Sequence, residues 1–374
     1  LAQTASGSQQ AFRWTSATGM ELLGDLPGGG VASWAHGCSA DGSVIVGFGE
    51  SAASSPQSEA FRWTRRDGMV ALGEFPGGMY LSQAYACSAD GSVVVGLSLS
   101  AAGFEAFRWT EQTGMVSLGD LPGGAISSSA QSITPDGSVI VGYGTTSTGY
   151  GAFRWTQQTG MISLGDLPGG MWFSLANGVS SDGAVVVGQS ISARSTPNGE
   201  AMRWVQGAGM SGLGDLDGGD FKSNAYAVSA DGRVVVGEAT TSLGSEAFLW
   251  DTEYGLRNLR ESLILANPAN AAALTNWTLS AATAISPDGT VIVGYGQNPQ
   301  NQREAWVARL PRACYANCDG STVPPYLGSS DFICFMTQYA AGSAYANCDG
   351  STTAPVLNVG DFICFMTRSA AGCP

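Results

Sequence analysis

The 374-residue sequence predicts an all-β propeller in residues 1–312 and a small α-helical module in residues 313–374. Two internal repeats and one change of composition lead to this prediction. In the first part, the motif A-F-R-W recurs at intervals that are mostly 46 or 49 residues. A shorter unit occurs twice after Pro311, where most of the cysteines lie. A period of about 40–50 residues with several short strands per unit is typical of propeller blades.

Each long unit contains four expected strands and one strong turn signal. The first strand runs into S-x-D-G, the second is V-V-V-G, the third is A-F-R-W and the fourth is G-M-x-x-L-G. Asp-Gly predicts a hairpin between the first two strands, because glycine tolerates a positive φ angle and aspartate hydrogen-bonds the turn. The third strand begins at Ala11, Ala60, Ala106, Ala152 and Ala201, and in weaker form at Ala247 and Ala305. The turn recurs at Asp41, Asp90, Asp136, Asp182, Asp231 and Asp288.

The apolar pattern predicts blades that are covered on both faces. The second strand is apolar at successive positions, as in Val44, Ile45 and Val46, whereas a half-buried strand would alternate. In the third strand, alternation places Phe61 and Trp63 on one face, where they can pack against a neighbouring blade.

The number of blades stays open. Six D-G hairpins, seven A-F-R-W strands and six G-M strands give one strand more than six four-stranded blades need. We favour a six-bladed ring, closed by pairing the N-terminal strands with the last hairpin. In one alternative the unmatched strand completes the blade of a neighbouring molecule, because an open sheet edge is a template for strand addition. A seven-bladed ring with an incomplete blade is the other alternative.

Charge and composition exclude several classes of partner. The net charge is −14, and Lys222 is the single lysine. Such an acidic surface repels phosphate backbones and anionic lipids, so we expect no nucleic-acid partner. No apolar run approaches the ~20 residues of a transmembrane helix, so we expect no membrane insertion. The chain begins at Leu1 without a charged and then apolar leader, which indicates a mature, secreted, extracellular product.

The long unit resembles the HAF-type extracellular repeat, whose hallmarks are A-F-R-W-T, G-M, L-G-D-L-P-G-G and S-x-D-G-x-V-V-V-G. The resemblance covers residues 11 to about 310. It implies a secreted, propeller-like domain, and it implies no catalytic residues.

The second repeat is a 30-residue unit with a polar loop followed by a helix. Both copies contain Y-A-N-C-D-G-S-T and D-F-I-C-F-M-T. In the first copy Phe332, Phe335, Met336 and Tyr339 have the spacing of one apolar helix face. Helices this short are not stable alone, so disulfides and a bound ion would have to stabilise the module.

This tandem unit resembles the dockerin type of docking module, in the cysteine-containing variety that ends in Gly-Cys-Pro. The resemblance implies two calcium sites, each built from oxygen ligands at alternating positions of an EF-hand-like loop. Matched position by position, the ligands of the first copy are Asn317, Asp319, Ser321, the backbone near Tyr326, and Asp331. Those of the second copy are Asn347, Asp349, Ser351, the backbone near Val356, Asn358 and Asp361.

Two departures from the dockerin pattern bear on the calcium sites. Each loop is about three residues longer than the family's twelve, and the first ligand is Asn where Asp is usual. With roughly two carboxylates per loop, we expect a weak calcium affinity, ~10⁻⁴ M. The alternative is that these Asn and Asp residues only form turns.

Cysteine usage indicates disulfides. Six of the eight cysteines lie between Cys314 and Cys373, and this density is typical of an oxidising, extracellular setting. A zinc site is the alternative, but the chain lacks C-x-x-C pairs and has one histidine. The symmetry of the copies suggests three pairs among the fifteen pairings that six cysteines allow. They are Cys318–Cys334, Cys348–Cys364 and Cys314–Cys373.

The sequence contains no established catalytic motif: no H-E-x-x-H, nucleophile elbow, phosphate loop or Ser/His/Asp set. We expect His36 to have a packing role, and Cys38 and Cys87 to be buried, because other units have Ile or Val at their position. We expect recurring arginines and acidic residues to form ion pairs between strands. These are Arg13, Arg62, Arg108, Arg154 and Arg203, with Asp25, Glu74, Asp120, Asp166 and Asp215.

Three functions are compatible with this pattern. The favoured one is a secreted, non-catalytic scaffold whose docking module joins protein to protein, self-assembling into an extracellular filament, tube or layer. Its partners would be copies of the same chain or a docking partner bound through residues 313–374. The second is a glycan-binding adhesin or surface-anchored lectin that uses aromatic residues outside the common repeat, Trp34, Tyr80, Trp172 and Trp277. The third is a polysaccharide lyase or hydrolase, for which the sequence singles out no carboxylate pair.

Overall fold

The computed structural model describes residues 2–3, 8–54, 57–195, 197–310, 329–340 and 358–371. The chain divides into two compact units, Leu1–Ala308 and Arg309–Pro374. This boundary lies four residues before the expected one at 312/313. Among the described residues, no helix is long and apolar enough to cross a membrane.

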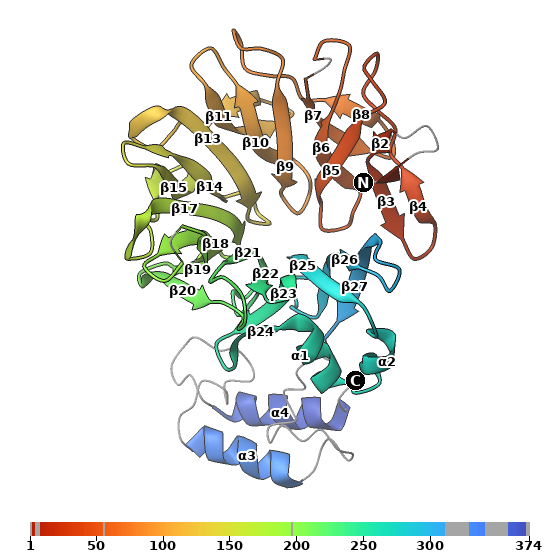
Figure 1. Cartoon of the computed structure of the whole chain (residues 1–374), viewed down its shortest axis with the longest axis vertical. Helices are drawn as coiled ribbons and strands as arrows, with labels where there is room; N and C mark the ends of the chain where they lie inside the picture. Colours follow the sequence, from red (N-terminus) through yellow and green to blue (C-terminus); the bar gives the residue numbers. More distant parts are fainter. Residues whose placement is uncertain are drawn as a thin grey trace. The chain divides into compact units, whose positions relative to one another are not determined.

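Five four-stranded antiparallel sheets, here called blades 1 to 5, make up most of the first unit. They follow one another in chain order around a common centre (Figure 1). A single parallel pair, Phe104 with Ser127, links blades 2 and 3.

Blade 1 contains β5 (Ser33–Cys38), β6 (Val44–Gly49), β7 (Glu59–Thr64) and β8 (Gly68–Ala71). Blade 2 contains β9 (Ser82–Cys87), β10 (Val93–Leu99), β11 (Phe104–Thr110) and β12 (Gly114–Ser117). Blade 3 contains β13 (Gly123–Ile133), β14 (Val139–Thr146), β15 (Tyr150–Thr156) and β16 (Gly160–Ser163). Blade 4 contains β17 (Gly169–Val179), β18 (Val185–Ser192), β19 (Glu200–Val205) and β20 (Gly209–Gly214). Blade 5 contains β21 (Ser223–Val228), β22 (Val234–Thr241), β23 (Gly244–Asp251) and β24 (Gly255–Asn258).

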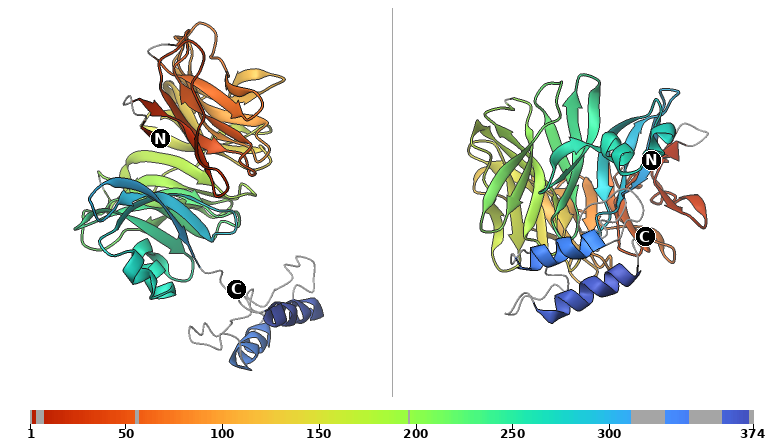
Figure 2. Two further views of the ribbon diagram at one scale, coloured as in Figure 1. Left: turned by 90° about the vertical axis from the view of Figure 1, so that its right-hand side faces the viewer. Right: turned by 90° about the horizontal axis from the view of Figure 1, so that it is seen from below.

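Two smaller sheets stand at the ends of this series. The first sheet consists of β3 (Phe12–Thr15) and β4 (Gly19–Leu22), which correspond to the third and fourth strands of a blade. The last sheet consists of β25 (Thr278–Ile285), β26 (Val291–Gln297) and β27 (Arg303–Arg309), which correspond to the first three strands. A short pair, β1 (Ala2–Gln3) and β2 (Gln9–Gln10), precedes them. The left view of Figure 2 looks at the side where the red N-terminal strands and the blue last sheet lie.

The closure expected between the N-terminal strands and the last hairpin is not formed in the part of the chain that the structure describes. Strand β3 pairs with β4, and the last sheet has the order β25-β26-β27. Strand β27 therefore occupies the edge of β26 that β3 would need. The sequence contains one third strand more than it has hairpins of first and second strands. For this reason two incomplete sheets remain.

Successive residues of the second strand pack against different neighbours. Val44 and Val46 belong to the apolar cluster between blades 1 and 2, while Ile45 belongs to the cluster between the first sheet and blade 1. All three are at most 5% exposed. Phe61 and Trp63 lie in the same cluster as Ile45. The predictions that the second strand is covered on both faces and that this aromatic pair shares one face are confirmed.

Glycine ends the V-V-V-G motif because a backbone carbonyl group lies against it. In blade 3 the ladder between the first two strands has an irregularity between Ala130 and Ser132. A Cβ atom added to Gly142 would lie 1.9 Å from the carbonyl oxygen of Ser129. In the D-G turn, Gly137 has a φ angle of 73°, as the hairpin prediction requires.

Short helices complete the described structure. After blade 5 the chain forms α1 (Leu259–Ala266) and α2 (Asn270–Ala273). The side chain of Asn258 caps α1 by accepting a hydrogen bond from the backbone of Glu261, and Leu259 and Leu263 are buried. The second unit contains α3 (Ser329–Ala340) and α4 (Val359–Ala371).

Candidate functional site

A serine in the first strand ties each of blades 1 to 5 to the sheet before it. In blade 3, Ser128 Oγ accepts a hydrogen bond from the backbone N–H of Ala106 (3.0 Å) and donates one to the carbonyl oxygen of Gly119 (2.7 Å). Ala106 and Gly119 both belong to the preceding unit of the repeat. We call this arrangement the serine clamp. It recurs at Ser33, Ser82, Ser174 and Ser223.

Replacing Ser128 by alanine is expected to destabilise the first unit by about 1–3 kcal/mol, because the buried N–H group of Ala106 loses its acceptor. Urea denaturation followed by tryptophan fluorescence measures this change. The matched control is Ser242→Ala, since Ser242 is exposed and should leave the midpoint unchanged. Equal midpoints for Ser128→Ala and the wild type would mean that the clamp contributes no stability.

The recurring arginines also connect neighbouring blades, but through backbone carbonyl groups. Arg62 Nε donates to the carbonyl oxygen of Gly91 (3.0 Å), in the D-G turn of the next blade. Arg154 and Arg203 make the equivalent bond to the next turn glycine. The expectation that these arginines pair with the recurring acidic residues is wrong for the described residues, whose salt bridges lie elsewhere. One of those acidic residues, Asp120, accepts instead from the backbone N–H groups of Leu121 and Ser127.

The aspartate of each D-G turn accepts several hydrogen bonds within its own turn. In blade 2, Asp90 Oδ1 accepts from the Ser88 hydroxyl (2.6 Å) and from the backbone N–H of Ser92 (3.0 Å). The hydrogen bonds from Ser88 and Ser92 lower the pKa of Asp90 to about 2. The same causes lower the pKa of Asp41, Asp136 and Asp182. These aspartates therefore shape turns.

The lowered pKa values predict how stability depends on pH. A carboxyl group whose pKa is lower in the folded state contributes stability above its ordinary pKa, ~3.9, and this stability is lost as the pH falls through the folded value. The urea midpoint should therefore fall between pH 4 and pH 2. It should fall less for Asp90→Asn, because the amide keeps the acceptor oxygen without titrating. The matched control is Asp220→Asn, because Asp220 is exposed. If the urea midpoint falls as much in Asp90→Asn as in the wild type, the lowered pKa of Asp90 does not contribute to this pH dependence.

His36 has the packing role that the sequence predicts. Its ring stacks on Phe48 (centroids 5.2 Å apart) and meets the edge of Tyr85. Burial lowers the pKa of His36 below its ordinary value. Of the two cysteines in the first unit, Cys87 is half-buried and Cys38 is exposed, so the expected burial of Cys38 is wrong. In the described part of the chain, the first sheet next to Cys38 consists of β3 and β4 alone, without the first and second strands that cover Cys87 in the next interface.

The four aromatic residues proposed for glycan binding lie on separate elements. Trp34 on β5 stacks on Phe48, and Trp172 lies on β17. Tyr80 precedes β9 and Trp277 precedes β25. Tyr80 is 49% exposed and Trp172 is 37% exposed. The ring contacts between described residues bring no two of the four together.

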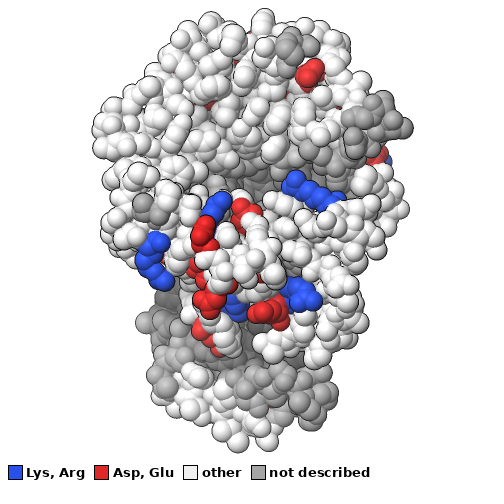
Figure 3. Space-filling view, in the orientation of Figure 1, with Lys and Arg blue, Asp and Glu red and all other residues white. Residues whose placement is uncertain are grey.

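Charged side chains are unevenly distributed over one face of the first unit. On the face shown in Figure 3, acidic and basic side chains lie mainly over the strands of blade 5 and helix α1, and most of the remaining face carries neither. A shallow depression of about 10 Å³ is lined by Lys222, Ser223, Asn224, Glu238, Thr240 and Ser245. It is smaller than the ~300–1,000 Å³ of typical small-molecule pockets.

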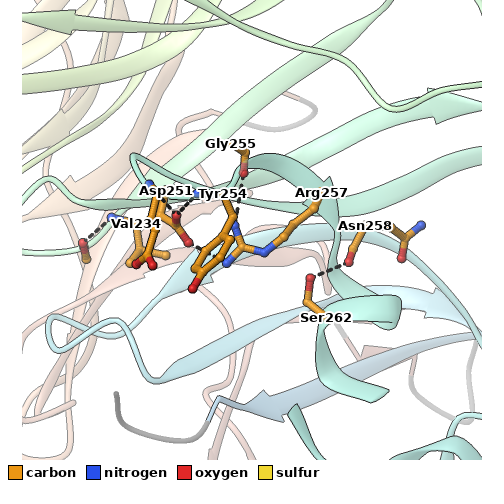
Figure 4. Close-up of polar contacts among 9 residues, drawn as sticks. Val234, Asp251, Tyr254, Gly255, Arg257, Asn258 and Ser262 are labelled. Atoms are coloured by element: carbon orange, nitrogen blue, oxygen red, sulfur yellow. Dashed lines mark hydrogen bonds and ion pairs between the residues drawn. The ribbon is translucent and has the colours of Figure 1, made fainter. Parts of the chain in front are cut away.

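An ion pair stabilises the hairpin turn between β23 and β24 in blade 5. Arg257 Nη2 lies 2.5 Å from Asp251 Oδ2, and the guanidinium group lies over the ring of Tyr254 (Figure 4). Asp251 Oδ1 also accepts from the backbone N–H of Tyr254. Burial raises the pKa of Asp251, but the hydrogen bonds from Arg257 and Tyr254 outweigh it, so the net pKa is lowered. Asp251 is therefore a structural anion.

In the second unit, the two helices pack through equivalent residues of the 30-residue repeat. The rings of Phe335 and Phe365 stack with centroids 4.2 Å apart, and the rings of Phe332 and Phe362 meet edge to face at 6.0 Å. Each residue thus contacts its own counterpart in the other copy. Phe335 and Phe365 are fully buried, which makes them the centre of the core of this unit.

The start of helix α4 has a reciprocal cap. Asn358 Oδ1 accepts from the backbone N–H of Gly360 (2.6 Å), and Asp361 Oδ2 accepts from the backbone N–H of Asn358 (2.8 Å). The bond to Asp361 is one half of a capping box, and the Asn358 side chain caps the second helical residue in place of the third. Asn358 and Asp361 therefore have a capping role, beside the calcium ligation that the resemblance implies.

Each expected calcium loop ends in a buried carboxylate in the first turn of its helix. Asp331 is 3% exposed and Asp361 is fully buried. Burying a carboxylate is costly unless it is hydrogen-bonded or bound to a cation, and calcium prefers carboxylate and amide oxygens. Of the expected calcium ligands, Asp331, Asn358 and Asp361 are the ones that the structure describes. Within the described ranges, no group of three or more His, Cys, Asp or Glu side chains could hold a metal ion.

The other calcium-ligand candidates lie outside the described residues. They are Asn317, Asp319, Ser321, Tyr326, Asn347, Asp349, Ser351 and Val356. Cys334 on α3 and Cys364 on α4 are both disulfide-bonded. The partners proposed for them, Cys318 and Cys348, and the proposed pair Cys314–Cys373 also lie outside the described residues.

The architecture of residues 1–308 is β-propeller-like, and comparison with solved structures agrees with this class. Puromycin hydrolase superimposes with a TM-score of 0.50 and 13% identity, over 81% of this chain and 49% of that one. TolB from Acinetobacter baumannii (TM-score 0.44, 13% identity) matches over 67% of this chain and 57% of its own. The chain thus spans about half the length of these proteins, and the likeness is one of fold alone. No protein-family model and no curated protein matches the sequence.

Proposed function

We propose that this chain is a secreted, non-catalytic scaffold protein in which a propeller of HAF-type repeats carries a dockerin-like, calcium- and disulfide-stabilised docking module. Through protein–protein contacts it builds an extracellular filament, tube or layer. With two incomplete sheets beside five complete blades, the ring has seven blade positions.

The observation that carries this proposal is the construction of the C-terminal unit. Each copy of its repeat buries one carboxylate in the first turn of its helix, Asp331 or Asp361, and each helix has a disulfide-bonded cysteine. A core centred on one stacked pair of rings is small, so a bound cation and disulfides would supply the remaining stability. Such a unit suits a docking role, because its order would depend on extracellular calcium and oxidation.

The first unit supports a non-catalytic role. Its polar groups repeat from blade to blade, and three of the repeating kinds have structural partners: the clamp serines, Arg62, Arg154 and Arg203 with their carbonyl groups, and the turn aspartates. Chemistry normally needs one asymmetric cluster of groups, and the depression lined by Lys222 and Glu238 is small.

Electron microscopy and light scattering of the full chain, with calcium and with a chelator, test the proposal. We expect ordered assemblies in calcium and their loss in chelator. The double variant Asp331→Asn and Asp361→Asn should behave as the wild type does in chelator, because it keeps the side-chain shape and loses the charge. Monodisperse single particles in both conditions would refute assembly.

Glycan binding is the second candidate, because Tyr80 and Trp172 expose aromatic surface outside the repeat pattern. A glycan array separates the two functions. Binding that is lost in Trp172→Ala, with no calcium-dependent assembly, would favour the lectin.

A further inference from the structure

Large apolar residues are exposed at one end of blades 2 to 4. The crossings into these three blades lie at this end, as do the loops between the second and third strands of blades 2 and 3. They lie together because the first two strands of a blade are antiparallel, so Gly123 at the start of β13 pairs with Thr146 at the end of β14. Met79 and Met171 are 63% and 57% exposed. The other large apolar residues of these segments are 37–49% exposed: Tyr80, Phe104, Ile126, Tyr150 and Trp172.

These five segments form one continuous surface, which we call the uncharged band: residues 76–81, 99–104, 122–127, 145–150 and 168–173. Each crossing is joined to the loop of its own blade, and each loop is joined to the next crossing. The contacts, in chain order, are the N–H of Leu99 with the carbonyl oxygen of Leu81, Phe104 paired with Ser127, the hydroxyl of Thr145 with the carbonyl oxygen of Ala125, and the rings of Tyr150 and Phe173. The exposed apolar residues are therefore not scattered singly over the surface.

The band contains no charged residue, although the net charge of the chain is −14. It also contains no Asn, Gln or His, so its hydrogen-bonding side chains are hydroxyl groups and the indole of Trp172. The crossing into blade 5 is different, since residues 217–222 include Asp217, Asp220 and Lys222. The absence of charge is thus a property of blades 2 to 4 and not of every crossing.

The size of the band approaches what a stable protein interface needs. If each of the seven residues has ~200 Å² of surface, their exposed fractions leave about 650 Å² open to solvent. The largest apolar patch of a typical monomer is ~300–600 Å² and is often functional. A standard interface takes ~800 Å² from each partner, and smaller exposed residues of the band, such as Ala102 and Ala125, add to its area.

We propose that the uncharged band is a contact surface between two copies of this chain, related by a twofold axis. In such a contact each copy contributes the same surface, which is the commonest arrangement in homo-oligomers. The inference rests on the proposed assembly function and deepens it, because it names one contact between copies. This contact lies in the first unit, so it does not depend on calcium.

The charge of the chain favours a second copy as the partner. Two copies with a net charge of −14 repel each other wherever acidic side chains face acidic side chains. A surface without charge avoids this repulsion when it meets itself. A basic partner, by contrast, would be attracted to the acidic residues outside the band. Protein interfaces are enriched in Tyr, Trp, Phe and Met and depleted of Lys, Glu and Asp, which is the composition of the band.

A glycan fits the band less well than a protein surface does. Sugar hydroxyl groups need several placed hydrogen-bond partners, and the amide and carboxylate side chains that could supply them are absent from the band. The two most exposed residues, Met79 and Met171, have flexible apolar side chains, which suit contact with another protein surface.

Sedimentation velocity of the full chain in chelator, over a series of protein concentrations, tests the proposal. We expect a reversible equilibrium between monomer and dimer. Raising the ionic strength should strengthen the dimer, because salt screens the repulsion between two acidic copies. A dimer that weakens with salt would be held by ion pairs outside the band, and this result would overturn the proposal.

Limited oxidation of methionine by hydrogen peroxide, followed by mass spectrometry, locates the contact. Oxidation of Met79 and Met171 should become slower as the protein concentration rises. Met20, which is 60% exposed on β4 and lies outside the band, should react at the same rate throughout. If Met79 and Met171 are already protected in the dilute monomer, another part of the same chain covers the band and the proposal is wrong.

A charge placed in the band should weaken the dimer. Met171→Asp should raise the dissociation constant at least tenfold, because the contact would bury an unpaired carboxylate. The matched control is Leu243→Asp, which adds the same charge outside the band, at a residue that is 81% exposed between β22 and β23. Both variants should keep the wild-type melting temperature, because both side chains are exposed. If Met171→Asp lowers it, Met79→Asp takes its place.

Equal dissociation constants in the band variant and in Leu243→Asp would overturn the proposal. The failure of this inference can be told apart from the failure of the assembly function. A chain that stays monomeric in chelator at every concentration, but forms ordered assemblies in calcium, refutes the band contact alone. A dimer in chelator without ordered assemblies in calcium refutes the filament, tube or layer and leaves the band contact standing.

Discussion

Replacing Phe335 by alanine is expected to unfold the C-terminal unit. The fully buried ring of Phe335 stacks on Phe365 at 4.2 Å, and a large-to-small change of this kind costs about 3–5 kcal/mol. A small unit has little more stability than that. Hydrogen exchange followed by mass spectrometry should show α3 and α4 exchanging at once while the blades stay protected.

The matched control for this prediction is Phe332→Ala. Phe332 is 39% exposed, and its ring only meets the edge of Phe362. In Phe332→Ala, helices α3 and α4 should lose their protection from hydrogen exchange more slowly than in Phe335→Ala. Equal exchange in the two variants would show that the stacked pair is not the centre of the core.

The second large effect is expected for Gly142→Ala in blade 3. The new methyl group would lie 1.9 Å from the carbonyl oxygen of Ser129, which is part of the strand ladder and cannot move aside. Overpacking against backbone should lower the free energy of unfolding by about 3 kcal/mol or more, measured by urea denaturation.

Gly151→Ala in the same blade is the control. A Cβ atom there meets the flexible end of Leu121 at 3.1 Å, and other blades have glutamate at this position. It should be nearly neutral. A large loss of stability in Gly151→Ala would mean that any added methyl group disrupts this blade.

The strands and turns could be predicted from the sequence because they depend on local chemistry. Asp-Gly fixes a hairpin whatever surrounds it, and the run Val44, Ile45 and Val46 requires cover on both faces. Their repetition then predicts a series of similar sheets, which the structure confirms.

Contacts between units could not be predicted in the same way. The sequence predicts that Arg62 pairs with an acidic side chain, since opposite charges attract. In the structure its guanidinium group donates instead to the carbonyl oxygen of Gly91 in the next turn. The acidic side chains satisfy backbone N–H groups nearer to them. The serine clamp could not be predicted from the sequence, because serine is common and the backbone N–H group that it binds lies 22 residues away.

The exposure of Cys38 could not be predicted because it depends on strands that are missing from the sheet next to it. Its counterparts Ile133, which is buried, and Val179, which is partly buried, suggest at least partial burial. Asn358 and Asp361 match the calcium-loop motif of the second copy and also suit the cap of helix α4. The sequence alone therefore leaves both roles open.

The serine clamp makes stability a nearest-neighbour property. Each clamp joins one blade to the one before it and reaches no further, so the array behaves as a chain of coupled links. Among the described residues, the first sheet and blade 5 each have one clamp, blades 1 to 4 each have two, and the last sheet has none. Unfolding should therefore start at the two ends of the array and proceed inward. A destabilising substitution in a middle blade would divide the unit into two halves that unfold independently.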